Sequence, residues 1–403
     1  MDKNEPLRAL FVGYGTTGTT FLTRLIDGLA IRGVHVTISG PDRKVVDYFP
    51  KGTVDWLWAP SWHGFSFLRM FHLLLLLIKA LPSKRKPWLR KLIHNKGSSI
   101  DKLKTLYQYL PFARGEWDVI YFPWNSSAID YLGLFDLGIP VVISCRGSQI
   151  NIRPHLRGQE SYVELVSQTL DRASAVHCVS EDILSNAVRL GLNPAKAVVI
   201  RPAVDPVFFH PADKPKKSAQ IDLITTGSLI WRKGYEYLLM SIRLMKNMGI
   251  TANLHIIGGG AERSRILFTA VDLGIASQVM MHGKLPPAEV KQRLGKADVF
   301  VLSSLSEGIS NAVLEAMSCG LPVVTTDCGG MREAVRDGIE GFVVPVRDPD
   351  EMAAALHKLA QSPELRNKMG RAGRERVLSA FNSQAQIDAF VNLFESVRVN
   401  ETN

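Results

Sequence analysis

Apolar runs and helical periodicities alternate along this chain and divide it into two similar halves. In the first half, residues 7–12 are apolar except for Arg8, which is typical of a buried strand. A glycine-rich turn follows, then a helical stretch over about 18–32 and a second strand at 34–38. We expect further strands at 118–122, 139–144 and 175–179, and helices at 101–110, 126–137, 159–171 and 181–190. Such alternation predicts a parallel sheet with helices on both faces.

The same pattern restarts after residues 205–218, a stretch rich in proline and lysine that indicates a linker. The second half predicts strands at 221–226, 252–257, 278–281, 298–302, 321–325 and 341–344, and its last helices at 349–361, 363–377 and 383–397. The chain has 403 residues, which is longer than a domain with a single hydrophobic core usually is, so two domains are expected. Their boundaries are 1–204 and 219–380, and residues 381–403 would form a helix that packs back on the N-terminal domain.

Composition narrows the class of protein. Hydrophobic residues make up 46% and charged residues 21% of the chain, as in an ordinary globular protein. The four cysteines show neither zinc-site spacing nor a disulfide framework, which favours a reduced, cytoplasmic compartment. The polar, acid-containing N-terminus does not resemble a secretory signal. The longest apolar stretch, residues 65–81, is interrupted by Arg69, His72 and Lys79, so we expect no membrane-spanning helix.

Positive charge is concentrated in one segment. Residues 79–104 hold nine Lys and Arg and one acid, Asp101, a local charge of +8 within a net charge of +10. Together with the preceding apolar stretch and Trp88, this is typical of an interfacial helix on an anionic membrane surface, so residues 65–104 predict a peripheral membrane partner. The alternative is a buried core helix over 73–78 followed by a solvated basic loop. No recognition module surrounds the segment, so nucleic acid is not an expected partner.

The first candidate ligand loop is Gly13-Tyr14-Gly15-Thr16-Thr17-Gly18, between the first strand and the first helix. Its glycines permit close approach of a ligand, and the helix N-terminus offers free N–H groups to an anion. A dinucleotide enzyme would also want an acid at the end of the second strand, but that strand ends at Ser39-Gly40 and Asp42 comes only after a proline. We therefore expect Gly15 to face another phosphate or sugar ligand, with plain turn chemistry as the alternative.

A second candidate loop follows the first strand of the second half and reads Thr226-Gly227-Ser228-Leu229-Ile230-Trp231-Arg232-Lys233-Gly234. Arg232 and Lys233 stand just before an expected helix start at Gly234. Cations and helix-terminal N–H groups together suit a diphosphate. A solvated Arg-Lys turn is the alternative.

The third motif places two glutamates eight residues apart, in Ser303-Ser304-Leu305-Ser306-Glu307-Gly308-Ile309-Ser310-Asn311-Ala312-Val313-Leu314-Glu315. We expect Glu307 on a loop after a strand, Ser310 as a helix N-cap, and Glu315 about one turn into the helix. Both carboxylates could then face the carboxyl edge of the sheet, where open α/β sheets bind ligands. Carboxylates accept hydrogen bonds from sugar and ribose hydroxyls, and the N–H groups of Ser310 and Asn311 can meet phosphate. Two exposed helix carboxylates are the alternative.

The ordered motifs from Gly227 to about Arg376 resemble the retaining GT-B glycosyltransferases of family four (glycosyl transferases group 1), typified by bacterial lipopolysaccharide and capsule sugar transferases. The N-terminal half matches only through its glycine-rich first turn. The resemblance implies an α/β fold of two Rossmann-like domains with parallel sheets facing across a cleft, the acceptor side being N-terminal and the nucleotide-sugar side C-terminal. The matching features are Lys233-Gly234, Gly258–Gly260, His282-Gly283, Ala297–Val301, Glu307 with Glu315, Gly320–Val324, Gly329-Gly330, Glu333 and Gly338 with Gly341.

The resemblance also implies roles for individual residues. Lys233 would bind the donor diphosphate, Glu315 the ribose hydroxyls, and Glu307 the donor sugar and phosphates. The other implied donor-binding positions are the loop backbone at Gly308, Ile309, Ser310 and Asn311, and the region beside the base at His282, Gly283 and Leu285.

Two departures from the family pattern affect the site. Many relatives carry an arginine directly after the glycine of the second loop, where this chain has Ser228, so Arg232 is expected to supply that charge. Many also carry a histidine after the strand at 139–144, where this chain reads Ser144-Cys145-Arg146-Gly147-Ser148. Arg146 is the candidate replacement, and the catalytic residues are expected to be Arg146 and Glu307.

The implied reaction moves a sugar, with retention, from a nucleoside-diphosphate sugar to a hydroxyl acceptor. We expect a lipid-linked or polysaccharide intermediate of bacterial surface glycan synthesis, and a cytoplasmic enzyme peripheral on the inner face of the membrane. The leaving diphosphate can itself help deprotonate the acceptor, so the protein supplies positioning and charge stabilisation. No cofactor and no metal are expected, because the cationic turn can neutralise the diphosphate. A non-catalytic nucleotide-sugar-binding subunit and a nucleotide-sugar epimerase are the alternatives.

Overall fold

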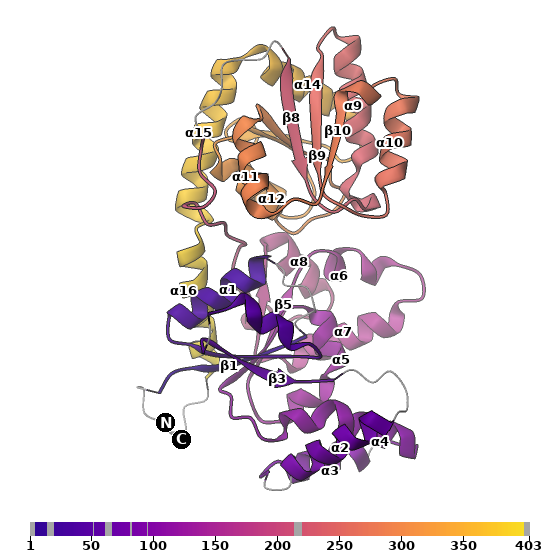
Figure 1. Cartoon of the computed structure of the whole chain (residues 1–403), viewed down its shortest axis with the longest axis vertical. Helices are drawn as coiled ribbons and strands as arrows, with labels where there is room; N and C mark the ends of the chain where they lie inside the picture. The colour runs from indigo at the N-terminus through magenta and orange to yellow at the C-terminus, as the bar shows by residue number, and fades with distance from the viewer. Residues whose placement is uncertain are drawn as a thin grey trace. The chain divides into compact units, whose positions relative to one another are not determined.

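The computed structural model describes residues 5–13, 20–50, 52–60, 67–80, 83–94, 96–212 and 220–398. The chain forms two compact units (Figure 1). The first contains Met1–Cys178, Leu184–Ile200 and Ile387–Asn403, and the second contains Val179–Ile183 and Arg201–Gln386. No signal in the sequence indicates that Val179–Ile183 belongs with the second unit.

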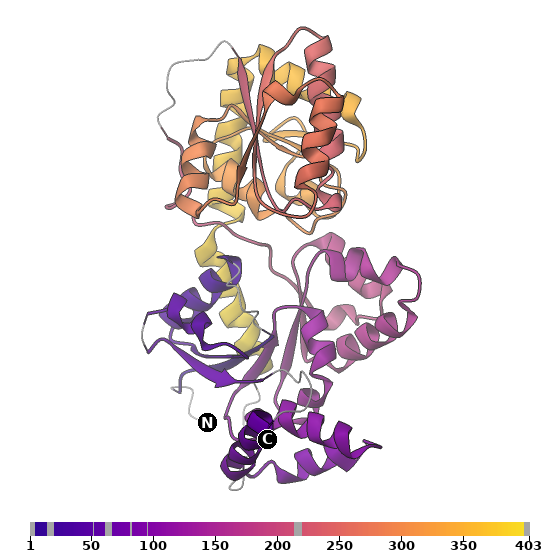
Figure 2. The same cartoon turned by 45° about the vertical axis from the view of Figure 1, so that its right-hand side comes forward.

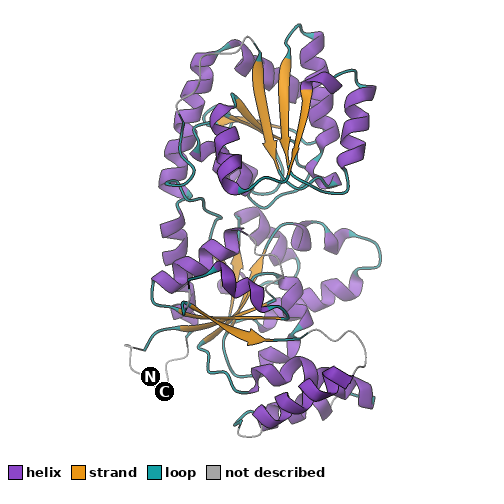
Figure 3. Ribbon diagram, viewed as in Figure 1, coloured by secondary structure: helices purple, strands orange, loops and turns teal. Residues whose placement is uncertain are grey.

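The first unit is built on a parallel sheet, whose strands are orange in Figure 3. Its seven strands lie in the order β3-β2-β1-β4-β5-β6-β7. Its central strands are buried on both faces, which accounts for their predominantly apolar sequences. The edge strands β3 and β7 were not predicted, because β7 has only three residues and β3 mixes an aspartate with aromatic residues. The strands are β1 (Arg8–Val12), β2 (His35–Gly40), β3 (Val54–Trp58), β4 (Val119–Phe122), β5 (Val141–Cys145), β6 (Ala175–Cys178) and β7 (Ala197–Val199).

Helices cover this sheet, and one of them comes from the C-terminal end of the chain. Phe390 and Phe394 of the last helix share an apolar cluster with Leu22 and Ile26 of the first helix. A Cβ atom on Gly28 would lie 2.1 Å from the Ile387 side chain, so glycine permits their close approach. The helices are α1 (Thr20–Ile31), α2 (Phe67–Ala80), α3 (Lys86–His94), α4 (Ser99–Tyr109), α5 (Asn125–Asp130), α6 (Ser148–Asn151), α7 (Glu160–Arg172), α8 (Glu181–Arg189) and α16 (Ser383–Val397).

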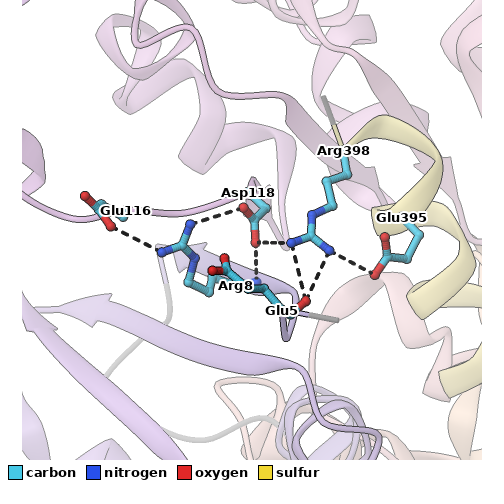
Figure 4. Close-up of polar contacts among 6 residues, drawn as sticks. All are labelled: Glu5, Arg8, Glu116, Asp118, Glu395 and Arg398. Carbon is cyan, nitrogen blue, oxygen red and sulfur yellow. Dashed lines mark hydrogen bonds and ion pairs between the residues drawn. The ribbon is translucent and has the colours of Figure 1, made fainter. Parts of the chain in front are cut away.

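A polar network ties the end of α16 to the start of the first sheet (Figure 4). Arg398 pairs with Asp118 at 3.6 Å and donates to the backbone oxygen of Glu5 at 3.4 Å. Asp118 also accepts the backbone N–H of Arg8 at 2.8 Å and its guanidinium at 3.4 Å. The side chains of Arg398 and Asp118 are 10% and 5% exposed, so their pairing is largely shielded from solvent. The network fixes α16 against β1 and the entry to β4.

The second unit is built on a six-stranded parallel sheet with strand order β10-β9-β8-β11-β12-β13. Helices on its two faces bury separate apolar clusters. The strands are β8 (Ile221–Thr226), β9 (Ala252–Ile257), β10 (Val279–Gly283), β11 (Val299–Leu302), β12 (Val323–Thr326) and β13 (Gly341–Val344). The helices are α9 (Tyr235–Asn247), α10 (Arg263–Asp272), α11 (Pro287–Lys296), α12 (Asn311–Ser318), α13 (Met331–Ala334), α14 (Pro349–Gln361) and α15 (Pro363–Ala380).

The first part of the expected linker packs on the second unit. Arg374 of α15 donates to the backbone oxygens of Phe209 and Pro206 at 2.8 and 2.9 Å. The Ser318 hydroxyl donates to the same Phe209 oxygen at 2.6 Å. These bonds hold the segment that the proline and lysine pattern had suggested to be a spacer, up to residue 212.

Candidate functional site

The order of the second sheet reverses between β8 and β11, which run parallel side by side although the chain visits β9 and β10 between them. Ligands of open α/β sheets bind at such a point, beyond the carboxyl ends of the strands. Residues 227–233 follow β8 and residues 303–310 follow β11. The topology therefore brings the second and third sequence motifs to one edge of the sheet.

A lysine and a glutamate from these two loops form an ion pair. The Lys233 ammonium contacts the Glu307 carboxylate, and the Ser304 hydroxyl donates to the same oxygen at 2.7 Å. The side chains of Lys233 and Glu307 are 13% and 12% exposed, so the charges are mostly withdrawn from water. Partial burial strengthens their interaction and makes either charge costly to leave alone. The sequence placed both residues in the site but did not predict that they pair.

The lysine turn is held rigidly against the glutamate loop. Gly234 adopts a left-handed conformation (φ +59°), and a Cβ atom there would lie 2.3 Å from the Ser303 backbone oxygen. The Ser303 hydroxyl donates to the Lys233 carbonyl at 2.9 Å. The Leu305 N–H donates to the Arg232 carbonyl at 2.7 Å. These bonds fix the ammonium and the carboxylate relative to the sheet.

Glycines form the wall behind the glutamate loop and the lysine turn. A Cβ atom on Gly329 (φ +57°) would lie 1.9 Å from the Glu307 backbone oxygen, and the Gly330 N–H donates to the Gly308 oxygen at 2.7 Å. A Cβ atom on Gly258 (φ +152°) would lie 1.8 Å from the Gly227 backbone oxygen. Such close backbone approach explains why these turns need glycine.

The first turn of α12 lies directly after the glutamate loop. Ser310 takes the extended backbone of an N-cap (φ −78°, ψ 119°), as expected, but its side chain makes no capping bond. The first N–H groups of a helix have no partner within it and attract anions. Among the described residues, the Asn311 Oδ1 and Arg232 Nε atoms are buried and have no hydrogen-bond partner. This edge therefore combines two cations, a helix N-terminus and unsatisfied polar atoms.

The remaining residues of the glutamate loop and α12 are placed near their expected elements. Gly308 is half-buried on the loop, and Ile309 is 7% exposed and belongs to the apolar cluster under α12. Glu315 lies in α12 with a half-buried side chain. Ser228 is exposed in the turn after β8.

Of the three residues expected beside the base, Gly283 alone contacts the glycine wall through a described bond. Its oxygen accepts the Gly258 N–H at 2.8 Å, while Leu285 packs at the margin of an apolar cluster. The His282 ring stacks on His255 at 5.2 Å with an interplanar angle of 12°, and the two rings are joined at 3.0 Å. Burial, then Arg293 and His255, lower the pKa of His282. The imidazole of His282 is thus engaged by the His255 ring.

Two uncharged groups lie close to the ion pair. Burial, and then the carboxylate of Glu307, raise the pKa of the Tyr235 phenol well above its usual value. Burial raises the pKa of the Cys328 thiol to about 12. Both groups are therefore neutral at physiological pH, and neither supplies a nucleophile or a base.

The other expected catalytic residue belongs to the first unit. Arg146 follows β5, its Nε atom donates to the Ser144 hydroxyl at 2.8 Å, and its guanidinium lies 4.3 Å from the centre of the Phe21 ring. Ser144 in turn contacts His177 of β6 at 2.9 Å. His177 was not singled out from the sequence, because a lone histidine inside an apolar strand carries no recognisable motif. Gly15 lies outside the described residues.

Two features are absent from the residues that the structure describes. In the described parts of the chain, no group of three or more His, Cys, Asp or Glu side chains is arranged to hold a metal ion. No described helix is long and apolar enough to cross a membrane.

Comparison with known proteins places the chain among relatives. Residues 208–376 match the family described as glycosyl transferases group 1, and residues 16–203 match the glycosyl transferase 4-like domain. The lipopolysaccharide core biosynthesis glycosyltransferase LpsE of Rhizobium meliloti is 30% identical over 46% of this chain and 51% of its own length. The amylovoran biosynthesis glycosyltransferase AmsK of Erwinia amylovora is 27% identical over 52% and 53%. The chain thus spans about half the length of the curated relatives it matches.

The fold also matches solved structures. Anabaena HepE, solved in complex with UDP-glucose, superposes with a TM-score of 0.70 over 97% of this chain and 100% of its own, at 15% identity. Likeness at this identity shows the fold, which is the two-sheet GT-B arrangement that the motifs implied. Because the two adjoining family matches together cover residues 16–203 and 208–376, the chain belongs to the glycosyl transferases group 1 family.

Proposed function

We propose that this protein transfers a sugar from a nucleoside-diphosphate sugar to a hydroxyl acceptor, with retention of configuration. The observation that carries the proposal is the cationic turn of Arg232 and Lys233 beside the first turn of α12, at the reversal of the second sheet. A diphosphate is the ligand that cations and helix N–H groups satisfy together. HepE was solved with UDP-glucose, which supports a nucleotide-sugar donor here.

In this proposal Lys233 and Arg232 hold the diphosphate. The backbone from Gly308 to Asn311 contributes N–H groups, and Glu315 accepts bonds from the ribose hydroxyls. Glu307 orients the donor sugar while its charge is balanced by Lys233. His282, Gly283 and Leu285 flank the base, with Gly283 rather than the imidazole of His282 meeting the ligand.

The leaving diphosphate accepts the acceptor's proton as the bond between sugar and phosphate breaks, so no protein base is required. Arg146 stabilises negative charge or orients the acceptor, because an arginine stays protonated at neutral pH and cannot act as a base. The relatives LpsE and AmsK act in lipopolysaccharide core and amylovoran biosynthesis, which supports an acceptor from bacterial surface glycan synthesis.

The nucleotide and the reaction are tested separately. Calorimetric titration of the purified chain with UDP and GDP should give saturable binding to one of them. The matching nucleotide sugars should then be consumed, and NMR of the product should show the anomeric configuration of the donor. Absence of binding to either diphosphate would overturn the proposal, whereas binding without hydrolysis or transfer would favour a non-catalytic binding subunit.

We further propose that residues 65–104 dock the protein on an anionic membrane where a lipid-linked acceptor resides. Helices α2, α3 and α4 group together in the first unit (Figures 1 and 2). Phe71, Leu74 and Ile78 of α2 are 58%, 54% and 54% exposed and recur at helical spacing, so they form one apolar stripe. Leu73, at 3%, is buried on the opposite side. A core helix over 73–78 would bury this stripe, so the exposure favours the interfacial interpretation.

Two residues of the basic segment contact the protein itself. Trp88 is 8% exposed and its indole N–H donates to the Gly133 oxygen at 2.9 Å, so it is not an interfacial anchor. Arg85 donates to the Phe112 oxygen at 3.1 Å, and burial lowers its pKa. The basic residues that we expect to contact the membrane are instead exposed: Lys84, Lys86, Arg90, Lys91 and Lys96.

Vesicle co-sedimentation tests the docking surface. Replacement of Lys84, Lys86, Arg90 and Lys91 by glutamine should weaken binding to vesicles containing phosphatidylglycerol, by at most about 1 kcal/mol for each charge. Leu74→Ser with Ile78→Ser should weaken it too, whereas Phe268→Ser with Val271→Ser, on exposed apolar positions of α10, serves as the matched control. Equal sedimentation of all variants, or no binding by the wild type at low salt, would refute docking.

A further inference from the structure

A chain of hydrogen bonds connects Arg146 to the interior of the first unit. Arg146 Nε donates to Ser144 Oγ at 2.8 Å, Ser144 Oγ contacts His177 Nδ1 at 2.9 Å, and His177 Nε2 contacts the Ile200 oxygen at 2.8 Å. Ser144 is fully buried and His177 is 1% exposed. The chain crosses from β5 to β6 and on to the residue that follows β7, so three neighbouring strands set its geometry.

The donor and the acceptor of each hydrogen bond in this series follow from the group at its end, the Ile200 backbone oxygen. A backbone carbonyl only accepts hydrogen bonds, so His177 Nε2 carries the ring hydrogen and Nδ1 presents a lone pair. The Ser144 hydroxyl must then donate to Nδ1, which leaves its oxygen free to accept from Arg146 Nε. Burial, and then the charge of Arg146, lower the pKa of His177 to about 3, so the ring is neutral at physiological pH and this arrangement persists.

Arg146 is therefore held at two points. Nε is bonded to Ser144, and the guanidinium carbon lies over the Phe21 ring, 4.3 Å from its centre. A bond to Nε together with a contact to the aromatic ring restricts the rotation of the guanidinium, and neither contact uses the two terminal nitrogens. A flexible arginine is thus converted into a preorganised pair of donors, the arrangement that charge stabilisation requires.

We propose that Ser144 and His177 are positioning residues that orient Arg146 for sugar transfer. This rests on the proposed function, since it presumes that Arg146 acts in the transfer step. Ser144 and His177 lie beneath the surface and act only through Arg146. These hydrogen bonds give Arg146 a fixed orientation, which a side chain on a loop would otherwise lack.

A double-mutant cycle tests the coupling to activity. Ser144→Ala should lower kcat by about 10- to 100-fold, the effect of misplacing a group that must be oriented, while the donor KM and the nucleoside-diphosphate Kd stay within about twofold. In an Arg146→Ala background the same change should have no further effect on kcat. Independent, multiplicative losses would overturn the positioning role. Arg189→Ala, on an exposed arginine of the same unit, is the control.

A matched pair at His177 tests the direction of the bonds. His177→Asn places an acceptor near the Nδ1 position and should preserve most of kcat, whereas His177→Gln places a donor near the Nε2 position and should lose as much as Ser144→Ala. Equal activity of the two variants, with equal melting temperatures, would contradict the assignment. If the variants fail to fold, the cycle at Ser144 still decides.

A readout that does not depend on activity separates this inference from the proposed function. Nitrogen–proton correlation spectra of the wild-type His177 ring should show the Nε2–H tautomer, uncharged, from pH 8 down to 5. The Nδ1–H tautomer or a protonated ring at pH 6 would overturn the hydrogen-bond chain even in an active enzyme. A protein with the expected tautomer but no transferase activity would instead refute the proposed function.

Discussion

Removal of the Lys233 ammonium is the most direct test of the donor site. In Lys233→Ala the diphosphate loses one charge-assisted hydrogen bond, and Glu307 loses its cation while keeping the Ser304 hydroxyl at 2.7 Å. A hydrogen bond to a charged group contributes about 1.5–3 kcal/mol, so nucleoside-diphosphate affinity should fall by about 13- to 150-fold. Calorimetry with UDP and GDP measures this directly.

The size of the loss in nucleoside-diphosphate affinity depends on whether the Lys233 ammonium interacts mainly with the Glu307 carboxylate or with the diphosphate. Glu307→Gln removes the competing charge, so it should leave diphosphate affinity unchanged or increase it, while lowering turnover. Lys233→Met keeps the aliphatic stem against Gly227 and separates lost packing from lost charge. Lys368→Ala, on an exposed lysine of α15, should change nothing. An unchanged diphosphate Kd in both Lys233 variants would refute the assignment.

The remaining predictions concern the two glutamates, Arg146 and His177. Glu315→Ala should weaken nucleoside-diphosphate binding through loss of a ribose contact, whereas Glu307→Ala should spare it and reduce turnover; transfer unaffected by either change would leave the pair as a feature of the helix face. Arg146→Ala should reduce kcat, and full activity of this variant would exclude a role for Arg146 in transfer. Raised activity of Arg146→His would indicate that a histidine is the better group at this position. The pKa of His177 is about 3 in the folded protein, below its usual 6.5. Between these pH values the ring is protonated in the unfolded state but not in the folded state. The free energy of unfolding therefore falls as the pH drops from 6.5 towards 3. Urea unfolding at pH 7 and pH 5 should show about 2 kcal/mol more loss for the wild type than for His177→Gln; equal losses would mean that His177 is not held neutral.

Much of the second half of the chain was correctly predicted from local pattern. Strands 221–226, 252–257 and 341–344 and helices 349–361 and 383–397 have the bounds that their apolar runs and helical periodicity indicated. Buried parallel strands and amphipathic helices are recognisable because each carries its own burial pattern in consecutive residues. The loops after β8 and β11 were recognised for a similar reason, since their residue types and spacing are themselves characteristic.

The first half was less predictable where burial depends on distant partners. Trp88 sits in a basic segment, yet tertiary packing buries it against Gly133, 45 residues away along the chain. The predicted helix over 126–137 divides into α5 and a 3-10 turn at Leu132–Asp136. The helical periodicity in the apolar stretch could have come from a core helix or an exposed one, and only the solvent exposure of Phe71 and Ile78 distinguished the two.

The sequence by itself determined which residue types stand at the carboxyl ends of the strands, and hence the family and the expected ligand chemistry. Only the tertiary structure decided which of them interact. Lys233 and Glu307 are 74 residues apart, and Ser144 and His177 are 33 residues apart. Lys233 and Glu307 meet because neighbouring parallel strands end at the same edge of the sheet. Ser144 and His177 meet because they are in register on neighbouring parallel strands. Strand order and register set both distances, whereas spacing along the chain does not.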